Sequence, residues 1–315
     1  MPARNIINNR VLALLCIAFL LLVLAACGGG GGTTNVPEPI ADNCGPTSIR
    51  ENGGCRTFAI MSGERAPTPF LENGERVELE VVLFKPLAGS RFPTIVVHHG
   101  STGDGSDPSR FGNTFTNKPL TRYFVERGWM VVFPQRRGRG KSDGLYDEGF
   151  KPDRSGYSCE ASAALAGASR ALEDLNVITD WVRDRADADT TRMLVGGASR
   201  GGILSIAHIA ARPDVYLAAI NFVGGWISEG CGDHLSINSK LFADGAAFPG
   251  QSLWLYGHND SFYSMSYSRS HFDAFSSAGG MGEFVELTRA PGLNGHFIIN
   301  DPELWENAMN DFLRQ

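Results

Sequence analysis

The sequence lacks a surplus of positive charge, and this absence limits the partners that it can have. Its 315 residues include 28 Lys and Arg against 34 Asp and Glu, for a formal net charge of -6. Proteins that bind nucleic acid neutralise phosphates with cations, so we expect no nucleic-acid partner. The hydrophobic content of 43% excludes a disordered or collagen-like chain. The composition is that of a globular protein, and no internal repeat is visible.

Metal-binding spacings are also missing. The 6 cysteines form no CxxC pair and the 7 histidines form no HxxxH pair, which are spacings that zinc sites commonly use. His98 and His99 are adjacent, but neighbouring residues of a strand point to opposite faces, so they do not easily share one ion. We therefore expect no metal, no organic cofactor and a structural role for both histidines.

The N-terminus carries an apolar run that is shorter than the ~20 residues needed to span a bilayer comfortably. Residues 1–10 contain two arginines and no acid, and residues 11–26 are 16 consecutive apolar residues that end directly before Cys27. A charged start, a short apolar stretch and small residues before a cysteine resemble a bacterial lipoprotein signal. A plain membrane anchor and an ordinary secretory signal are the alternatives.

This resemblance implies three segments. Residues 1–26 are expected to be the signal peptide and residues 27–43 a flexible Gly-rich tether that begins at lipidated Cys27. Residues 44–315 then form one folded domain. Gly28, not Asp, follows Cys27, which in Gram-negative lipoproteins points to the outer membrane. We expect a lipid-anchored protein of the bacterial cell envelope, with the membrane as a partner through its lipid.

Four cysteines remain once the signal peptide and the lipidated residue are set aside. An even number in an oxidising compartment favours disulfides, and four cysteines allow three pairings. We favour Cys44–Cys55, which closes a short Gly- and Pro-containing loop, together with Cys159–Cys231.

Buried strands alternate with amphipathic helices through the body of the chain. This order predicts an α/β fold with about eight mostly parallel strands, helices on both faces of the sheet and no second domain. Residues 224–250 lie between two strands and are expected to form a small cap. The expected strands are 76–84, 94–98, 129–133, 192–196, 217–222, 252–256 and 283–287, and the expected helices are 117–127, 162–185, 202–211, 267–278 and 302–313.

The segment Gly197-Ala198-Ser199-Arg200-Gly201 follows an expected strand and opens an expected helix. GxSxG in this context is the pattern of a nucleophile elbow. The chain must reverse within a few residues, so the serine takes strained backbone angles and the flanking glycines let strand and helix approach. Ser199 is therefore the candidate nucleophile, at the carboxyl ends of the strands where α/β proteins build their sites.

A serine hydroxyl needs a base, and the base needs a residue that orients it. Asp260 follows the strand expected at 252–256, and His296 follows the one expected at 283–287. The order Ser, Asp, His is the one that accompanies a nucleophile elbow. His258 lies too close to its strand end, and His271 lies on an expected helix where a surface role is more common. The remaining acids considered, Asp233, Asp273 and Asp301, are expected to be solvated caps.

An oxyanion hole requires two backbone N–H groups. The first is expected from Arg200, which follows the nucleophile. The second is expected from the Gly-rich loop after the strand at 94–98, and we favour Ser101, with Gly100 or Thr102 as alternatives.

These motifs resemble those of the α/β-hydrolase superfamily, and the details are similar to dienelactone hydrolases and to the catalytic domains of prolyl oligopeptidases. The resemblance covers roughly residues 77–313. It implies an α/β-hydrolase fold and hydrolysis through an acyl-enzyme intermediate. Dienelactone hydrolases use a cysteine nucleophile where this chain has Ser199. Prolyl oligopeptidases carry an N-terminal propeller, for which residues 27–77 are too few.

One loop is rich in cations: Arg136, Arg137, Arg139 and Lys141 fall within six residues. An acidic protein without an aromatic platform does not suggest nucleic acid binding here. The loop can border the mouth of the active site, hold a loop conformation or meet an anionic substrate.

The favoured function is hydrolysis of carboxylic esters, with a small-molecule or short acyl substrate as the partner. Cleavage of amides by an exopeptidase-like enzyme and a non-catalytic binding lipoprotein are the alternatives. Four aromatic residues are candidates to line the substrate pocket or to fill a core: Trp226, Phe248, Phe262 and Tyr263.

Overall fold

The computed structural model describes residues 43–314. Its elements in chain order are β1 (Ser48–Glu51), β2 (Gly54–Thr57), β3 (Ile60–Glu72), β4 (Glu75–Lys85), β5 (Phe92–His98), η1 (Pro108–Arg110), α1 (Lys118–Val125), β6 (Met130–Pro134), α2 (Ala161–Arg183), β7 (Ala188–Ala198), α3 (Arg200–Ile209), β8 (Ala218–Phe222), α4 (His234–Gly245), β9 (Gln251–Gly257), α5 (Met265–Ser277), β10 (Met281–Leu287), η2 (Gly295–Asn300) and α6 (Pro302–Phe312).

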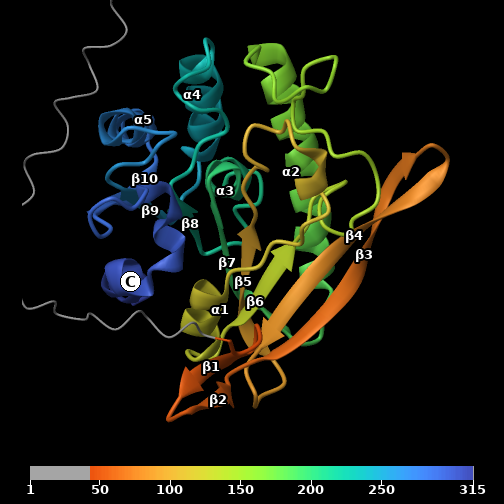
Figure 1. Ribbon diagram of the computed structural model, residues 1–315, viewed down its shortest axis with the longest axis vertical. Coiled ribbons are helices and arrows are strands. Elements are labelled where there is room, and N and C mark those ends of the chain that lie inside the picture. The colour runs from red at the N-terminus through yellow and green to blue at the C-terminus, as the bar shows by residue number, and fades with distance from the viewer. Residues whose placement is uncertain (1–42, 315) are drawn as a thin grey trace, which may run out of the picture. The chain divides into compact units, whose positions relative to one another are not determined.

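One eight-stranded sheet organises the fold, with the strand order β10-β9-β8-β7-β5-β6-β4-β3 (Figure 1). The pairs from β10 to β6 are parallel, whereas β4 is antiparallel to both of its neighbours. β6 and β8 are buried along their whole length, because helices cover both faces of a parallel sheet. The α/β-hydrolase fold with a mostly parallel sheet is confirmed.

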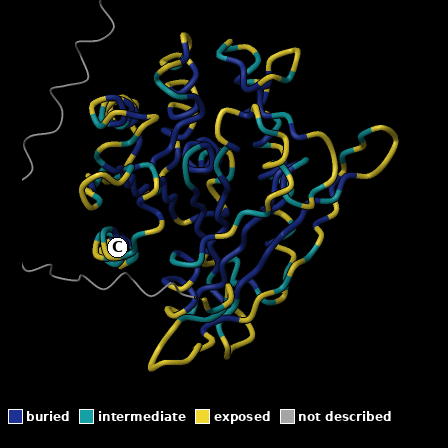
Figure 2. Tube along the Cα trace, viewed as in Figure 1, coloured by how far each residue is buried: buried dark blue, intermediate teal, exposed yellow. Residues whose placement is uncertain are grey.

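Helices lie on both faces of the sheet. α1 and α6 pack against each other, while α2 and α4 both pack against α3, and α5 packs against α4. Figure 2 shows buried segments running through the middle of the molecule and exposed ones at its periphery. Each of the twelve segments expected from the sequence overlaps an element of the expected type, with ends that differ by a few residues.

β3 supplies the eighth strand, which the sequence pattern did not identify. It is an edge strand in which exposed residues alternate with partly or fully buried ones, and it contains Pro67 and Pro69. Proline inside a segment argues against a central strand but is accepted at a sheet edge. β1 and β2 form a separate two-stranded sheet.

The segment between β8 and β9 corrects one expectation. In place of a small cap over residues 224–250, it contains α4, which packs against α2, α3 and α5. α4 is thus a crossover helix of the parallel sheet. The first part of the segment, from Trp226 to Cys231, contributes to the pocket described below.

Both favoured disulfides are present. Cys44 pairs with Cys55, and Cys159 pairs with Cys231 across 72 residues of sequence. The expected signal peptide, Cys27 and all but the last residue of the expected tether lie outside the described residues. Within residues 43–314, no helix has the length and apolar character needed to cross a membrane.

Candidate active site

Ser199 occupies a strained turn between β7 and α3. Its φ of 56° and ψ of -121° lie outside the regions that residues with a side chain normally adopt. A Cβ on Gly197 would lie 2.5 Å from the Gly201 carbonyl oxygen, and a Cβ on Gly201 would lie 2.0 Å from the His98 carbonyl oxygen. Both positions therefore require glycine, as the elbow pattern predicts. Strain of this kind is common at functional sites, where the surrounding structure maintains it.

The topology brings this turn next to the loop that follows β5. β5 lies between β6 and β7, both of which come later in the chain. The connections that leave β5 and β7 therefore depart from neighbouring strand ends, at a point where the strand order reverses. Ligands of open α/β sheets bind at such points. A Cβ on Gly100 would lie 3.2 Å from the Ser199 Cβ, so the two segments are in close contact.

Asp260 and His296 form a hydrogen-bonded pair on the side of the sheet where the strands end. The Asp260 Oδ2 atom lies 2.8 Å from His296 Nδ1. Asp260 Oδ1 accepts hydrogen bonds from the backbone N–H groups of Phe262 and Tyr263, at 2.8 and 3.2 Å. The Asp260 side chain is 1% exposed, so its orientation is fixed by these bonds. An ion-pairing carboxylate at Nδ1 leaves Nε2 as the ring atom that can exchange a proton with a nucleophile.

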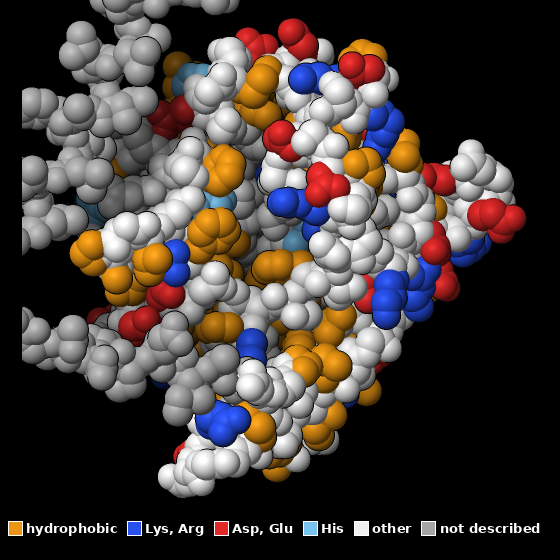
Figure 3. Space-filling model, in the orientation of Figure 1, with side chains coloured by type: hydrophobic (Ala, Val, Ile, Leu, Met, Phe, Trp, Pro, Cys, Tyr) orange, Lys and Arg blue, Asp and Glu red, His pale blue; other side chains and the backbone are white. Residues whose placement is uncertain are grey.

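Ser199 and His296 both line one pocket with a volume of about 730 Å³. Figure 3 shows hydrophobic side chains gathered around a hollow on the face of the molecule. Trp226, Phe262 and Tyr263 line the pocket, whereas Phe248 is buried in the core. The ring of Phe262 lies 4.6 Å from that of His296. The wall combines these apolar side chains with polar ones, among them Asn117 and Arg139, and pockets of this size commonly hold small molecules.

Tyr263 packs against Gly225, whose N–H donates to the Ser199 carbonyl oxygen at 3.2 Å. A Cβ on Gly225 would lie 2.2 Å from the Tyr263 ring. Burial raises the pKa of the Tyr263 hydroxyl well above its ordinary value, while the Arg200 charge and a hydrogen bond with Ser199 act in the opposite direction. Tyr263 therefore remains neutral and able to hydrogen-bond the candidate nucleophile.

Two N–H groups are available to an oxyanion. Arg200 is the first residue of α3, and the first N–H groups of a helix have no acceptor within it. On the opposite loop, the Thr102 N–H donates to the Tyr157 hydroxyl at 3.2 Å. This bond occupies Thr102 and leaves Ser101 and Gly100 as the remaining candidates on that loop.

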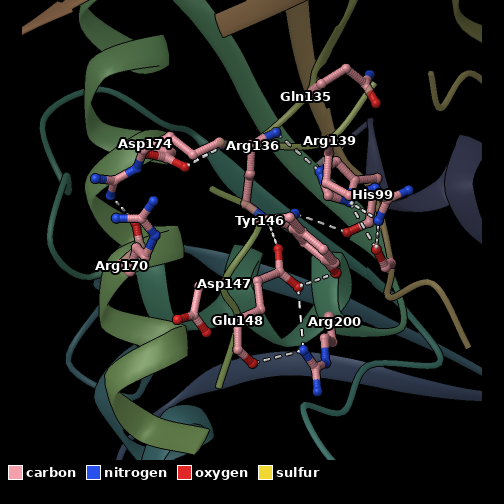
Figure 4. A network of polar contacts seen from close by, with 12 residues as sticks. His99, Gln135, Arg136, Arg139, Tyr146, Asp147, Glu148, Arg170, Asp174 and Arg200 are labelled. Atoms are coloured by element: carbon pink, nitrogen blue, oxygen red, sulfur yellow. Dashed lines mark hydrogen bonds and ion pairs between the residues drawn. The ribbon is translucent and has the colours of Figure 1, made fainter. Parts of the chain in front are cut away.

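A buried polar cluster holds both oxyanion segments (Figure 4). The Arg200 guanidinium donates to the carbonyl oxygens of Trp226 and Glu148, at 2.8 and 3.0 Å. It stacks on the Tyr157 ring, 3.6 Å from the ring centroid. Tyr157 in turn binds Thr102, so the segment from residue 146 to residue 157 contacts the elbow and the opposite loop together.

The cationic loop after β6 is mostly internal. Arg136, Arg137 and Arg139 are each 5% exposed or less, and Lys141 is exposed. Arg137 pairs with Asp174 at 2.6 Å. Arg139 lines the pocket. This loop therefore holds a conformation and also borders the site, two of the roles considered from the sequence.

The other histidines do not join the pair. His98 and His99 are fully buried, and burial lowers the pKa of each ring well below its ordinary value. His258 lies 3.2 Å from Glu286 at the surface. His271 was expected at the surface, but it is buried, and burial lowers its pKa to about 4. Among the described residues, no three His, Cys, Asp or Glu side chains form a metal-binding group.

Three residues of this site were missed in the sequence: Tyr146, Glu148 and Tyr157. They lie in a polar, Gly-rich loop without periodicity. A signal was nevertheless present, because large aromatic side chains recur in that loop at positions 146, 150 and 157, and a solvated loop rarely needs them.

Solved structures share this fold. An acylaminoacyl peptidase from Pyrococcus horikoshii matches with a TM-score of 0.56 and 18% identity, over 82% of this chain and 41% of that chain. Est1E from Butyrivibrio proteoclasticus, solved with ferulic acid bound, matches with a TM-score of 0.55 and 14% identity, over 77% of this chain and 98% of that one. At such identities the likeness establishes the fold alone.

Curated relatives include acetylxylan esterase A from Aspergillus awamori, 24% identical over 164 residues, which are 52% of this chain and 47% of that protein. Acetylxylan esterase A from Emericella nidulans is 22% identical over 181 residues, which are 55% of this chain and 52% of the relative. The chain spans about half the length of these relatives.

The fold and the matching family model together place the chain in the α/β-hydrolase superfamily. Within that class it belongs to the X-Pro dipeptidyl-peptidase (S15) family, whose model matches residues 73–246, more than half of the chain.

Proposed function

We propose that this protein hydrolyses carboxylic esters through a Ser199–His296–Asp260 triad and an acyl-enzyme intermediate. The Ser199 Oγ atom attacks the ester carbonyl carbon while its proton passes to His296 Nε2. Backbone N–H groups of Arg200 and Ser101 stabilise the negative oxygen that forms. His296 then protonates the leaving alcohol, and a water molecule, activated by the same ring, releases the acid and restores Ser199.

The observation that carries this proposal is the bond between Asp260 and His296 in a pocket that Ser199 also lines. Ester chemistry is further supported by the relatives, which are acetylxylan esterases by name. No step of the reaction requires a metal or an organic cofactor, since the proton and the oxyanion are both handled by the chain itself.

Cleavage after proline in a peptide is the second candidate, and the family description favours it. An enzyme that removes dipeptides must hold the free amine of its substrate, for which buried carboxylates are suited. Asp104 is the one Asp or Glu that lines the pocket within the described residues. Its Oδ1 atom is already bonded to the N–H and hydroxyl of Ser106. The pocket therefore offers little for an ammonium group, and we favour esters.

The test is turnover of a p-nitrophenyl ester series from acetate to octanoate, beside Ala-Pro-p-nitroanilide. We expect the esters to be cleaved with a preference for short chains, and Ser199→Ala to lower kcat by about 10⁴-fold or more. Efficient cleavage of the anilide with poor cleavage of every ester would replace the ester proposal with the peptidase one. No turnover by a folded protein on either class would refute both.

We also propose that the protein is anchored in the bacterial cell envelope by lipid on Cys27. The sequence order before Cys27 supports this. Labelling with an alkyne-tagged fatty acid in a Gram-negative host should mark the parent and not Cys27→Ser. A parent without label, recovered free in the periplasm, would contradict the anchor without affecting the chemistry.

A further inference from the structure

Beside the oxyanion loop, three buried guanidinium groups surround one buried carboxylate. Arg136, Arg139, Arg200 and Glu148 are 2%, 5%, 3% and 3% exposed. Figure 4 shows Arg139 and Arg136 beside His99, with Glu148 between Arg136 and Arg200. Three positive charges and one negative charge give these four side chains a net charge of about +2, with little exposure to water. A buried charge without a partner is costly, so such clusters are normally balanced.

Glu148 makes no hydrogen bond with Arg139. Its Oε1 atom accepts from Arg136 Nε at 2.5 Å. Its Oε2 atom accepts from Arg200 Nη1 at 3.3 Å and from the Tyr146 hydroxyl at 3.1 Å. Burial acts to raise the pKa of Glu148, but Arg136 and Arg200 hold it below its ordinary value. The carboxylate is therefore ionised, and its hydrogen bonds come from Arg136, Arg200 and Tyr146, while Arg139 interacts with it only through space.

Arg139 is the arginine left over. It forms no ion pair with any carboxylate in the described part of the chain, and its Nε atom has no hydrogen-bond partner there. It donates to the Gly100 carbonyl oxygen, 3.3 Å from Nη1, and its guanidinium carbon lies 5.2 Å from the centroid of the Tyr146 ring. A neutral carbonyl at this distance does not neutralise a guanidinium.

His99 does not serve as the partner either. Its Nε2 atom accepts from the Arg136 backbone N–H at 3.1 Å, so the ring proton is on Nδ1. Nδ1 then donates to the Gly100 carbonyl oxygen at 2.8 Å. Arg139 Nη1 lies 3.4 Å from this same nitrogen, which as a donor cannot accept its proton. Arg139 thus keeps its positive charge beside the pocket that it lines.

We propose that Arg139 binds a carboxylate of the substrate, and that the esters cleaved by this protein carry an acid group in addition to the scissile bond. This inference rests on the proposed ester hydrolysis. A guanidinium presents parallel N–H donors that match the two oxygens of a carboxylate, and the match is strong where water is excluded. The acid group would supply the charge that the cluster lacks, close to Gly100 and hence to the oxyanion loop.

A structural role is the competing explanation for Arg139, because it also holds the Gly100 carbonyl oxygen. The two roles predict different results. A residue that only supports the loop affects esters alike whatever their charge, whereas a carboxylate-binding residue changes the preference between a charged ester and a neutral one of the same shape.

The experiment compares mono-p-nitrophenyl succinate with p-nitrophenyl succinamate, and 4-acetoxybenzoate with 4-acetoxybenzamide. The first pair places the acid on the acyl side and the second on the alcohol side. We expect the parent to prefer the acid at least tenfold in kcat/KM in one pair. The ratio of acid to amide should fall at least tenfold in Arg139→Gln and recover in large part in Arg139→Lys. Arg122→Gln is the matched control, since this exposed arginine on α1 carries the same charge away from the pocket.

A second readout does not depend on turnover. Succinate or benzoate should raise the unfolding temperature of the parent and of Arg122→Gln, and not that of Arg139→Gln. A parent that shows no acid preference in either pair, or a preference that survives in Arg139→Gln, overturns the inference while leaving ester hydrolysis intact. A parent that cleaves none of these esters refutes the proposed function. In that case the unfolding temperatures decide the matter. If succinate or benzoate stabilises the parent but not Arg139→Gln, the carboxylate site is supported. If neither acid stabilises the parent, the carboxylate site is refuted.

Discussion

Replacement of Tyr157 by Phe should slow catalysis without weakening substrate binding. The Tyr157 hydroxyl accepts from the Thr102 N–H at 3.2 Å and lies 3.0 Å from Thr102 Oγ1. It also lies 2.5 Å from the Tyr146 hydroxyl, which donates to Glu148 Oε2. Because the Tyr146 proton goes to Glu148, the Tyr157 proton goes to Tyr146, and both Thr102 donors point at Tyr157. A one-directional chain of hydrogen bonds thus fixes the Thr102 peptide next to Ser101.

The size of the effect follows from what Tyr157→Phe leaves behind. The Thr102 N–H would be buried without an acceptor, which costs about 1–3 kcal/mol of folding stability. Complete loss of an oxyanion donor lowers kcat by about 10²–10³-fold. The variant keeps the Ser101 N–H, but the neighbouring Thr102 peptide loses the hydrogen bond that holds it. We therefore expect kcat to fall by about 10–100-fold, equivalent to about 1.4–2.7 kcal/mol of transition-state stabilisation.

Steady-state kinetics on p-nitrophenyl acetate, with urea unfolding of the same samples, measure both quantities. Tyr146→Phe is the matched control, because it removes a hydroxyl of the same chain and leaves the bond between Tyr157 and Thr102. It should lose comparable stability but no more than about threefold in kcat. Equal kinetic losses in the two variants, or a Tyr157→Phe variant that changes KM alone, would refute the reasoning.

Three further predictions concern the scaffold. Gly201→Ala should abolish activity and lower the free energy of unfolding by about 3 kcal/mol, because the new Cβ would lie 2.0 Å from the His98 carbonyl oxygen. Far-UV circular dichroism measures the loss of stability, and ester turnover measures the loss of activity. Burial, with Arg212 nearby, lowers the pKa of His208 to about 3, so its contribution to stability is complete above pH 6.5 and is lost as the pH falls. Urea unfolding should lose about 2 kcal/mol from this group between pH 7 and pH 5, and His208→Gln should remove that part of the slope. The double variant Cys159→Ala, Cys231→Ala should lower the free energy of unfolding by up to ~4 kcal/mol, because the disulfide closes a loop of 72 residues. A parent that is equally stable in reducing and non-reducing buffer would contradict this.

The nucleophile turn could be predicted because its constraints are local. The space between β7, α3 and the His98 carbonyl requires glycine at Gly197 and Gly201, and this requirement is written directly in the sequence. Asp260 and His296 each follow a later strand of the parallel sheet. Because the carboxyl ends of parallel strands lie on the same side of the sheet, both residues come to the side where Ser199 lies. The pairs Cys44–Cys55 and Cys159–Cys231 were also favoured from the sequence, and both are present.

Other features depend on contacts that leave no periodic trace. β3 is an edge strand with two prolines, and its pairing with β4 compensates for a weak local preference. α4 became a crossover helix and not a cap because its apolar residues pack against α3. The role of Arg139 could not be fixed from sequence, since it depends on the Glu148 oxygens bonding to Arg136 and Arg200 and not to Arg139.

The central claim, that Ser199 is the nucleophile of a hydrolase, is tested most directly by covalent trapping. The parent is incubated with a fluorophosphonate, digested and analysed by mass spectrometry. We expect a single adduct on the peptide that contains Ser199, formed in step with the loss of ester turnover and strongly slowed in His296→Ala. No adduct, or an adduct on another residue while ester turnover is lost, would contradict the account.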